Sequence, residues 1–194
     1  MKPITLIIAA ALAAAPAYAG NSLIPAGRMV QVAKSAMAVT PGSEWNKLGR
    51  RPGTNGEIWT LDGDKLNRVT FYGGIAPDTT LFREVDRKNS PLPRFSQTML
   101  LTDVPKLLEN SYRVALGSAL FTIDQMEPAR FGGVDGIRFT YSFVAGNQEV
   151  QSKGEARAAI VKGRLYMISY EAPALHFFEK NVAQFRQIAD SATF

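Results

Sequence analysis

A strict alternation of apolar and polar residues around position 140 constrains this chain more than any other feature. Every second position there is apolar, at Ile137, Phe139, Tyr141 and Phe143. A period of two indicates a strand with one buried face. Further strand-like segments lie at 121–129, 150–161 and 164–170, and Lys162-Gly163 forms a tight turn between the last two. Because a parallel return needs a crossover of about a dozen residues, such short joins predict an antiparallel sheet.

Two segments show helical spacing instead. Apolar residues recur every three or four positions across 103–117; Asp103 can cap this helix and Gly117 can end it in a left-handed conformation. A second helix is predicted to open at Pro173, with Phe178, Val182, Phe185 and Ala189 as its apolar stripe.

The first half predicts further strands. Residues 29–40 read as one strand stopped by Pro41-Gly42, and 57–61 with 67–72 read as a hairpin around Asp62-Gly63-Asp64. The expected fold class is therefore α+β, a central antiparallel sheet covered by two amphipathic helices in an α/β/α sandwich. Between the predicted hairpin and the first predicted helix, residues 74–101 show no apolar periodicity. A loop that long is uncommon in a compact domain, so it either hides a short element near 81–85 or has a function.

The amino terminus has the features of a secretory signal. Lys2 precedes an apolar run from Ile4 to Ala15, and Ala17-Tyr18-Ala19 matches the small-x-small cleavage pattern. That run is too short to cross a bilayer, which takes about 20 residues. We therefore expect a signal peptide at 1–19, a flexible leader at 20–27, a single domain over 28–194, and no transmembrane segment after signal removal.

The chain contains no cysteine. This excludes disulfides, thiolate chemistry and a lipid-modified cysteine, so the protein is not expected to be a lipoprotein. Export without cysteine is ordinary for a bacterial periplasmic protein, and a periplasmic or secreted location is predicted.

One residue could serve as an imidazole general base. His176 is the single histidine, so a multi-histidine metal site is excluded, and neither a metal nor a cofactor is expected. With Glu171 nearby in sequence, His176 could serve a small hydrolase or isomerase as a general base. The competing interpretation is a surface or packing residue, since no nucleophile elbow occurs in the chain.

Basic residues are concentrated in one part of the sequence. The formal charge is +5, and removal of Lys2 with the signal leaves +4. Residues 20–106 carry 12 basic and 8 acidic residues, whereas 107–194 carry nine of each. The whole excess of the mature chain thus lies before position 107.

This excess suggests a binding surface. The candidate binding residues are Trp45, Arg83, Arg87, Lys88, Arg94 and Phe95, with Arg50-Arg51 nearby. Such a cationic and aromatic surface would suit an envelope protein, an anionic lipid or an anionic glycan. A merely solvated loop, balanced by Glu84 and Asp86, is the alternative. No nucleic acid is expected, because no basic helix with interleaved aromatics is present.

The sequence resembles the PsbP-like superfamily. The resemblance rests on Val39-Thr40-Pro41 shortly before Trp45, the run from Gly163 to Tyr170, and the ending Ala192-Thr193-Phe194. That superfamily includes an extrinsic photosystem II subunit, a nuclear import factor that binds a small GTPase, and bacterial envelope proteins. The resemblance implies an antiparallel sheet between helices and a non-enzymatic binding or accessory role, but it carries over no functional residue.

Overall fold

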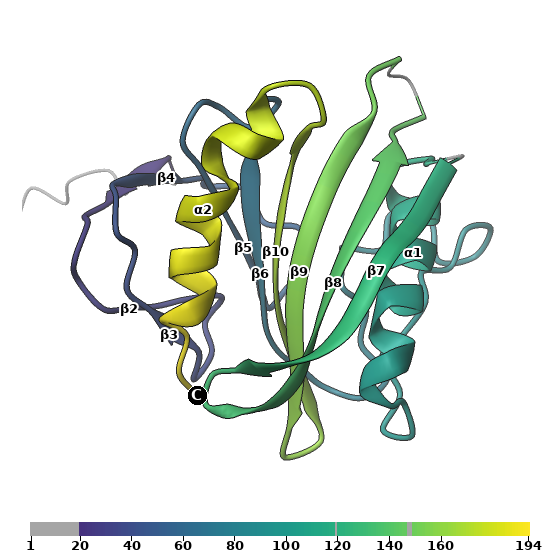
Figure 1. Ribbon diagram of the computed structural model, residues 1–194. Coiled ribbons are helices and arrows are strands. Elements are labelled where there is room, and N and C mark those ends of the chain that lie inside the picture. The colour runs from purple at the N-terminus through teal and green to yellow at the C-terminus, as the bar shows by residue number, and fades with distance from the viewer. Residues whose placement is uncertain (1–19, 119, 147–148) are drawn as a thin grey trace, which may run out of the picture.

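Ten strands and two α-helices make up the described part of the chain. The computed structural model describes residues 20–118, 120–146 and 149–194 (Figure 1). The strands are β1 (Ser22–Ile24), β2 (Val30–Gln31), β3 (Ala38–Val39), β4 (Trp45–Lys47), β5 (Gly56–Thr60), β6 (Arg68–Ile75), β7 (Leu120–Phe131), β8 (Val134–Val144), β9 (Ser152–Val161) and β10 (Arg164–Pro173). The helices are α1 (Val104–Ala115), preceded by a short 3-10 turn at Leu101–Asp103, and α2 (Phe177–Asp190). The predicted signal peptide at 1–19 lies outside the described residues.

Eight strands form one sheet in the order β1-β4-β5-β6-β10-β9-β8-β7. Each neighbouring pair is antiparallel, which confirms the antiparallel α+β prediction. The crossover in this order is the pairing of β10 with β6, in which Leu165 lies opposite Ile75. This pairing brings the start of β10 beside the end of β6, although they are about ninety residues apart in sequence.

The sheet carries an apolar core on each face. On one face, α2 packs Phe178 and Phe185 against Tyr170 of β10. On the other, α1 packs Leu108 and Tyr112 against β8, β9 and β10. The alternation in β8 therefore separates two surfaces, because its aromatic members face α1 and its polar members face the opposite side.

The helices cover the sheet incompletely. In Figure 1, α2 lies over the β5-β6-β10 side, and α1 packs on the other face near β7 and β8. The α2-side surface of β7 and β8 carries exposed or half-buried polar residues, and α2 reaches the neighbouring strand β9, where its Arg186 binds the buried Glu155. The fold is thus richer in sheet than the predicted α/β/α sandwich, since the two helices are offset and each covers only part of one face.

Three local predictions differ from the structure. The single strand expected at 29–40 is a hairpin of β2 and β3, and the flexible leader expected at 20–27 contains β1, which pairs with β4. Pro173 ends β10 instead of opening a helix, and α2 begins at Phe177. The structure confirms the helix predicted at 103–117, with Gly117 in the left-handed region at φ 59°.

No helix in the described part of the chain combines the length and apolar composition needed to cross a membrane.

Candidate functional site

A hollow of about 730 Å³ opens between the 76–95 segment, the 51–55 loop and the turn that joins β2 to β3. We call it the basic groove. Five cationic side chains line it: Lys34, Arg51, Arg83, Arg94 and Arg164. A single carboxylate, that of Glu84, is also in the lining. The groove therefore concentrates positive charge in a concave site of the size typical for ligand pockets.

The segment on one side of the groove is folded back on itself. Thr80 and Arg94 form a β-bridge, and the backbone of Phe95 exchanges hydrogen bonds with Asp78 (2.8 Å) and Thr79 (2.9 Å). The Phe95 ring is buried in the α1-side core. The long loop predicted at 74–101 thus has ordered, anchored arms, which hold Arg94 at the edge of the groove.

Most cations of the groove lack a counter-ion. Arg94 donates to Glu84 at 2.6 Å, but Lys34, Arg51 and Arg83 form no ion pair with any residue that the structure describes. Arg164 likewise has no carboxylate partner among them and donates only to the carbonyl of Gly74, at 3.2 Å. Uncompensated guanidinium and ammonium groups in a concavity attract an anion from solvent.

Lys34 reaches the groove from a strained turn. Ala33 and Lys34 lie at the two central positions of the tight turn over 32–35 and have φ values of 53° and 51°. Non-glycine residues pay about 1–2 kcal/mol each for the left-handed conformation. Such strain persists only when the surroundings enforce it, and it concentrates at functional sites.

A buried carboxylate enforces the turn. Glu57 on β5 accepts the backbone N–H of Ala33 at 3.1 Å, the indole N–H of Trp59 at 2.8 Å and the ammonium group of Lys47 at 2.9 Å. Hydrogen bonds to a charged group contribute about 1.5–3 kcal/mol, comparable with the strain of one turn residue. Glu57 is therefore positioned to hold Lys34 over the groove.

The rest of the lining suits recognition more than catalysis. Hydroxyl and amide groups come from Thr54, Asn55, Thr79 and Thr80, and Phe82 adds an apolar wall. Within this lining the only carboxylate is already bound by Arg94, and no histidine is present. The groove thus provides charge and hydrogen bonds for a bound anion without a general acid–base pair.

The predicted binding residues separate into three groups. Arg83 and Arg94 line the basic groove. Arg87 and Lys88 are exposed farther along the loop and are not part of the lining. Trp45 and Phe95, expected on the surface, are instead 0% and 1% exposed, because their rings pack into the two cores.

His176 and Glu171 contact different partners in the structure. His176 is exposed at the residue before α2, and its ring packs edge-on against Phe177. Glu171 is buried, forms an ion pair with Arg68, and accepts the hydroxyl of Tyr112 at 2.5 Å. No hydrogen bond or ion pair joins His176 to Glu171 among the described residues, so the geometry does not assemble the acid–base pair that the alternative function needs.

The surroundings of Glu171 fix its partners in one protonation state. Burial, aided by the negative charge of Glu171, raises the pKa of Tyr112 far above its ordinary range, so the hydroxyl remains a donor. The same negative charge raises the pKa of Arg68. Glu171 therefore acts as a buried acceptor within a stable network.

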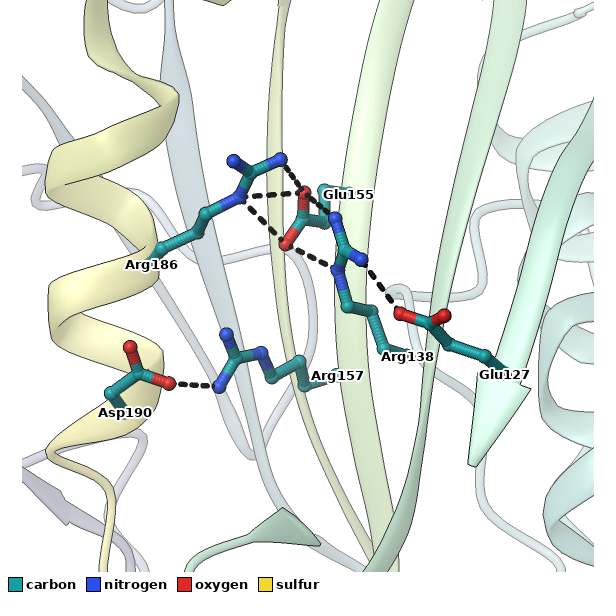
Figure 2. Close-up of polar contacts among 6 residues, drawn as sticks. All are labelled: Glu127, Arg138, Glu155, Arg157, Arg186 and Asp190. Carbon is teal, nitrogen blue, oxygen red and sulfur yellow. Dashed lines mark hydrogen bonds and ion pairs between the residues drawn. The ribbon is translucent and has the colours of Figure 1, made fainter. Parts of the chain in front are cut away.

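A second polar cluster lies where α2 meets the strands β8 and β9 (Figure 2). In it Glu155 of β9 is bound by Arg138 of β8 and by Arg186 of α2. Arg138 also reaches Glu127, and Arg157 pairs with Asp190. Three carboxylates match three guanidinium groups, so this cluster is neutral as a whole and offers an incoming anion no excess charge.

Two cations of the basic groove, Lys34 and Arg164, were not predicted from the sequence, and neither were its hydroxyl and amide groups. Lys34 sits inside what reads as a strand, and the one local signal was the polar pair Lys34-Ser35 within an apolar run. Arg164 lies in the half of the chain with no charge excess and reaches the groove through the pairing of β10 with β6.

Comparisons with known proteins address the fold. No family model matches the sequence, and no curated protein matches it. Among solved structures, cyanobacterial PsbP (CyanoP) from Synechocystis sp. PCC 6803 matches with a TM-score of 0.52 and 13% identity, over 90% of this chain and 92% of that one. The chain has the PsbP fold.

Two further solved structures match less well. The Ran-binding protein Mog1p from Saccharomyces cerevisiae is 9% identical over 85% of this chain and 93% of its own, with a TM-score of 0.48. LpqN, involved in cell envelope biogenesis of Mycobacterium tuberculosis, is 10% identical over 90% and 83%, with a TM-score of 0.34. The match to CyanoP, with its TM-score of 0.52, confirms at the level of the fold the PsbP-like resemblance inferred from the sequence.

Proposed function

We propose that this protein is an exported, non-enzymatic binding or accessory module of the cell envelope that holds an anionic group in its basic groove. One observation carries the proposal: Lys34, Arg51, Arg83 and Arg164 surround one hollow without a carboxylate partner among the described residues. The PsbP fold is compatible with this role, and the solved structures that resemble it include proteins named for binding a partner or for envelope biogenesis.

Export to the periplasm is part of the proposal and rests on the sequence. The features of residues 1–19 fit a cleaved signal. Expression of the full chain followed by cell fractionation and amino-terminal sequencing should yield periplasmic protein that starts at Gly20. A cytoplasmic protein that still begins at Met1 would overturn this part alone.

Two arginines of one loop form a matched pair for testing the groove. Arg83 lines it and Arg87 does not, although both are exposed. Both variants change the net charge equally, so a difference between them reports the position of the arginine. Binding of citrate and of pyrophosphate should weaken by about fivefold or more in Arg83→Glu and by less than about twofold in Arg87→Glu. The wild-type affinity should also fall as salt rises.

Two outcomes would contradict the proposal. Equal weakening in both variants would mean that only net charge matters. Absence of measurable binding to either anion at low salt would remove the anion-binding function itself.

A further inference from the structure

Two further hollows adjoin the basic groove in series. An inner hollow of about 210 Å³ shares Arg51, Phe82 and Arg83 with it. A third hollow, of about 300 Å³, shares Arg68 and Leu116 with the inner one. The shared walls make the three hollows neighbours, and we call their sequence the basic track.

Cationic side chains continue along the track, although two of them are paired there, Arg50 with Asp64 and Arg68 with Glu171. The inner and third hollows both include Arg50 and Arg68, and the third adds Lys65. The cations of the track are Lys34, Arg50, Arg51, Lys65, Arg68, Arg83, Arg94 and Arg164, and its carboxylates are Asp64, Glu84 and Glu171. Eight cations against three carboxylates give the track a formal charge of +5, which exceeds that of the whole mature chain.

The distribution of this charge favours an elongated ligand. At one end, Lys34 projects from the β2–β3 turn and Arg164 lies beside the carbonyl of Gly74. At the other, Lys65 is exposed and has no ion pair with any described residue. A single small anion cannot occupy both ends, since they belong to different hollows.

The rings of the protein argue against a nucleic acid. Binding of single strands relies on exposed aromatic side chains on which the bases stack. Of the aromatic rings that line the track, those of Tyr72, Tyr112 and Phe143 are buried and that of Phe82 is half-buried, so successive bases would find one ring to stack on. The track contains Arg side chains that suit carboxylates bidentately, together with the half-buried apolar side chains of Phe82 and Leu116.

We propose that the basic track binds an extended acidic peptide segment of a partner protein, an inference that rests on the proposed function. The carboxylates of the peptide would lie in the basic groove and the third hollow, and its apolar side chains against Phe82 and Leu116. A peptide meets both requirements, because acidic and apolar side chains can alternate along one extended chain. A plain polyanion such as polyphosphate would leave the apolar walls unused.

A length series tests this proposal. Peptides that combine Glu with Leu or Val, of about 4, 8 and 12 residues, span roughly 13 to 40 Å when extended. Affinity for the mature protein should rise at least about tenfold from the shortest to the longest peptide, and the longest should shift backbone NMR signals at both Lys34 and Lys65. A 12-residue peptide of Ser and Gly is the uncharged control.

Variants at the far end separate this inference from the proposed function. Lys65→Glu should weaken the longest peptide by about fivefold to tenfold and leave citrate binding unchanged. Arg28→Glu is the matched control, since Arg28 is exposed and lines none of the three hollows; it should leave the binding of both citrate and the longest peptide unchanged. Circular dichroism of each variant verifies that it remains folded.

Three results would overturn the inference. If affinity is independent of peptide length and Lys65→Glu matches Arg28→Glu, the track is not one site, although citrate binding would still support the groove. Saturable binding to phosphatidylglycerol vesicles without peptide binding would assign the track to a membrane surface. Equal affinity for a 12-residue single-stranded DNA would assign it to polyanions in general.

Discussion

Replacing Glu155 by Gln tests whether the network in Figure 2 stabilises the fold. The Glu155 side chain is fully buried and accepts hydrogen bonds from Arg138 at 2.9 Å and from Arg186 at 2.8 Å. Removing one partner of a buried ion pair typically costs 3–5 kcal/mol. Here the side chains of Arg138 and Arg186 keep 27% and 44% exposure, so water recovers part of that energy. We expect Glu155→Gln to lower the free energy of unfolding by about 2–3 kcal/mol.

The loss should depend on pH in a defined direction. Burial alone raises the pKa of Glu155, but the hydrogen bonds and charges of Arg138 and Arg186 outweigh it and hold the pKa below its ordinary value of 4.5. A carboxylate with a depressed folded-state pKa stabilises the protein above its unfolded-state pKa, and this contribution disappears as pH falls through the folded-state value. The difference between wild type and Glu155→Gln should therefore be largest near neutral pH and shrink in acid.

Urea denaturation at about pH 7 and about pH 3 measures both effects, with Glu127→Gln as the control. Glu127 also binds Arg138, at 2.7 Å, but its side chain is 58% exposed. An exposed pair contributes about 0.2–1 kcal/mol, so the control should lose less than about 1 kcal/mol. If Glu155→Gln loses no more than Glu127→Gln, or if its deficit persists unchanged in acid, the assignment of stabilising energy to the buried carboxylate is refuted.

Three further variants probe the groove and His176. Lys34→Gly should raise the free energy of unfolding by about 1 kcal/mol because it relieves a left-handed conformation, and it should weaken citrate binding severalfold; unchanged binding would remove Lys34 from the site. Glu57→Gln should cost about 1–3 kcal/mol in urea denaturation and also weaken citrate, since the turn loses its tether; a loss of stability with full binding would contradict the positioning role. His176→Asn should change stability by less than about 0.5 kcal/mol and leave citrate affinity intact, whereas a tenfold loss would return the ring to the site.

Side-chain periodicity predicted the main sheet because its cause is local. The alternating residues of β8 point to opposite faces in the structure, with Phe139 and Tyr141 in the α1-side core and Arg138 and Thr140 on the other side. A strand with a period of two can bury only one set of side chains, so this prediction needed no knowledge of partners. The same holds for the apolar stripe of α2.

The β2–β3 hairpin could not be predicted in this way. Tight turns with positive φ at both central positions normally require Gly or Asn, and here Ala33 and Lys34 occupy them. The determinant is Glu57, 24 residues further along the chain, which accepts the N–H of Ala33. This buried tertiary contact overrides the conformational preference of the turn residues. The sequence pattern alone therefore predicts a continuous strand.

The basic site was predictable only in part for a similar reason. The local charge excess pointed to the chain before position 107, and two of the residues predicted there, Arg83 and Arg94, line the groove. Arg164 comes from a neutral half of the sequence and joins them through strand pairing. Trp45 and Phe95 share the neighbourhood of basic residues in sequence, but burial depends on which face of an element a ring occupies, and both face a core.

Charge compensation distinguishes the two polar regions of this fold. Where α2 meets β8 and β9, Arg138, Arg157 and Arg186 each contact a carboxylate, which is the arrangement that minimises the electrostatic free energy of the folded protein alone. Around the basic groove the opposite holds: four of its five cations have no carboxylate partner among the residues that the structure describes, and Lys34 is held in a strained turn. A fold optimised only for stability would relieve both costs, so their coincidence at one hollow is physical support for a ligand that supplies the missing negative charge.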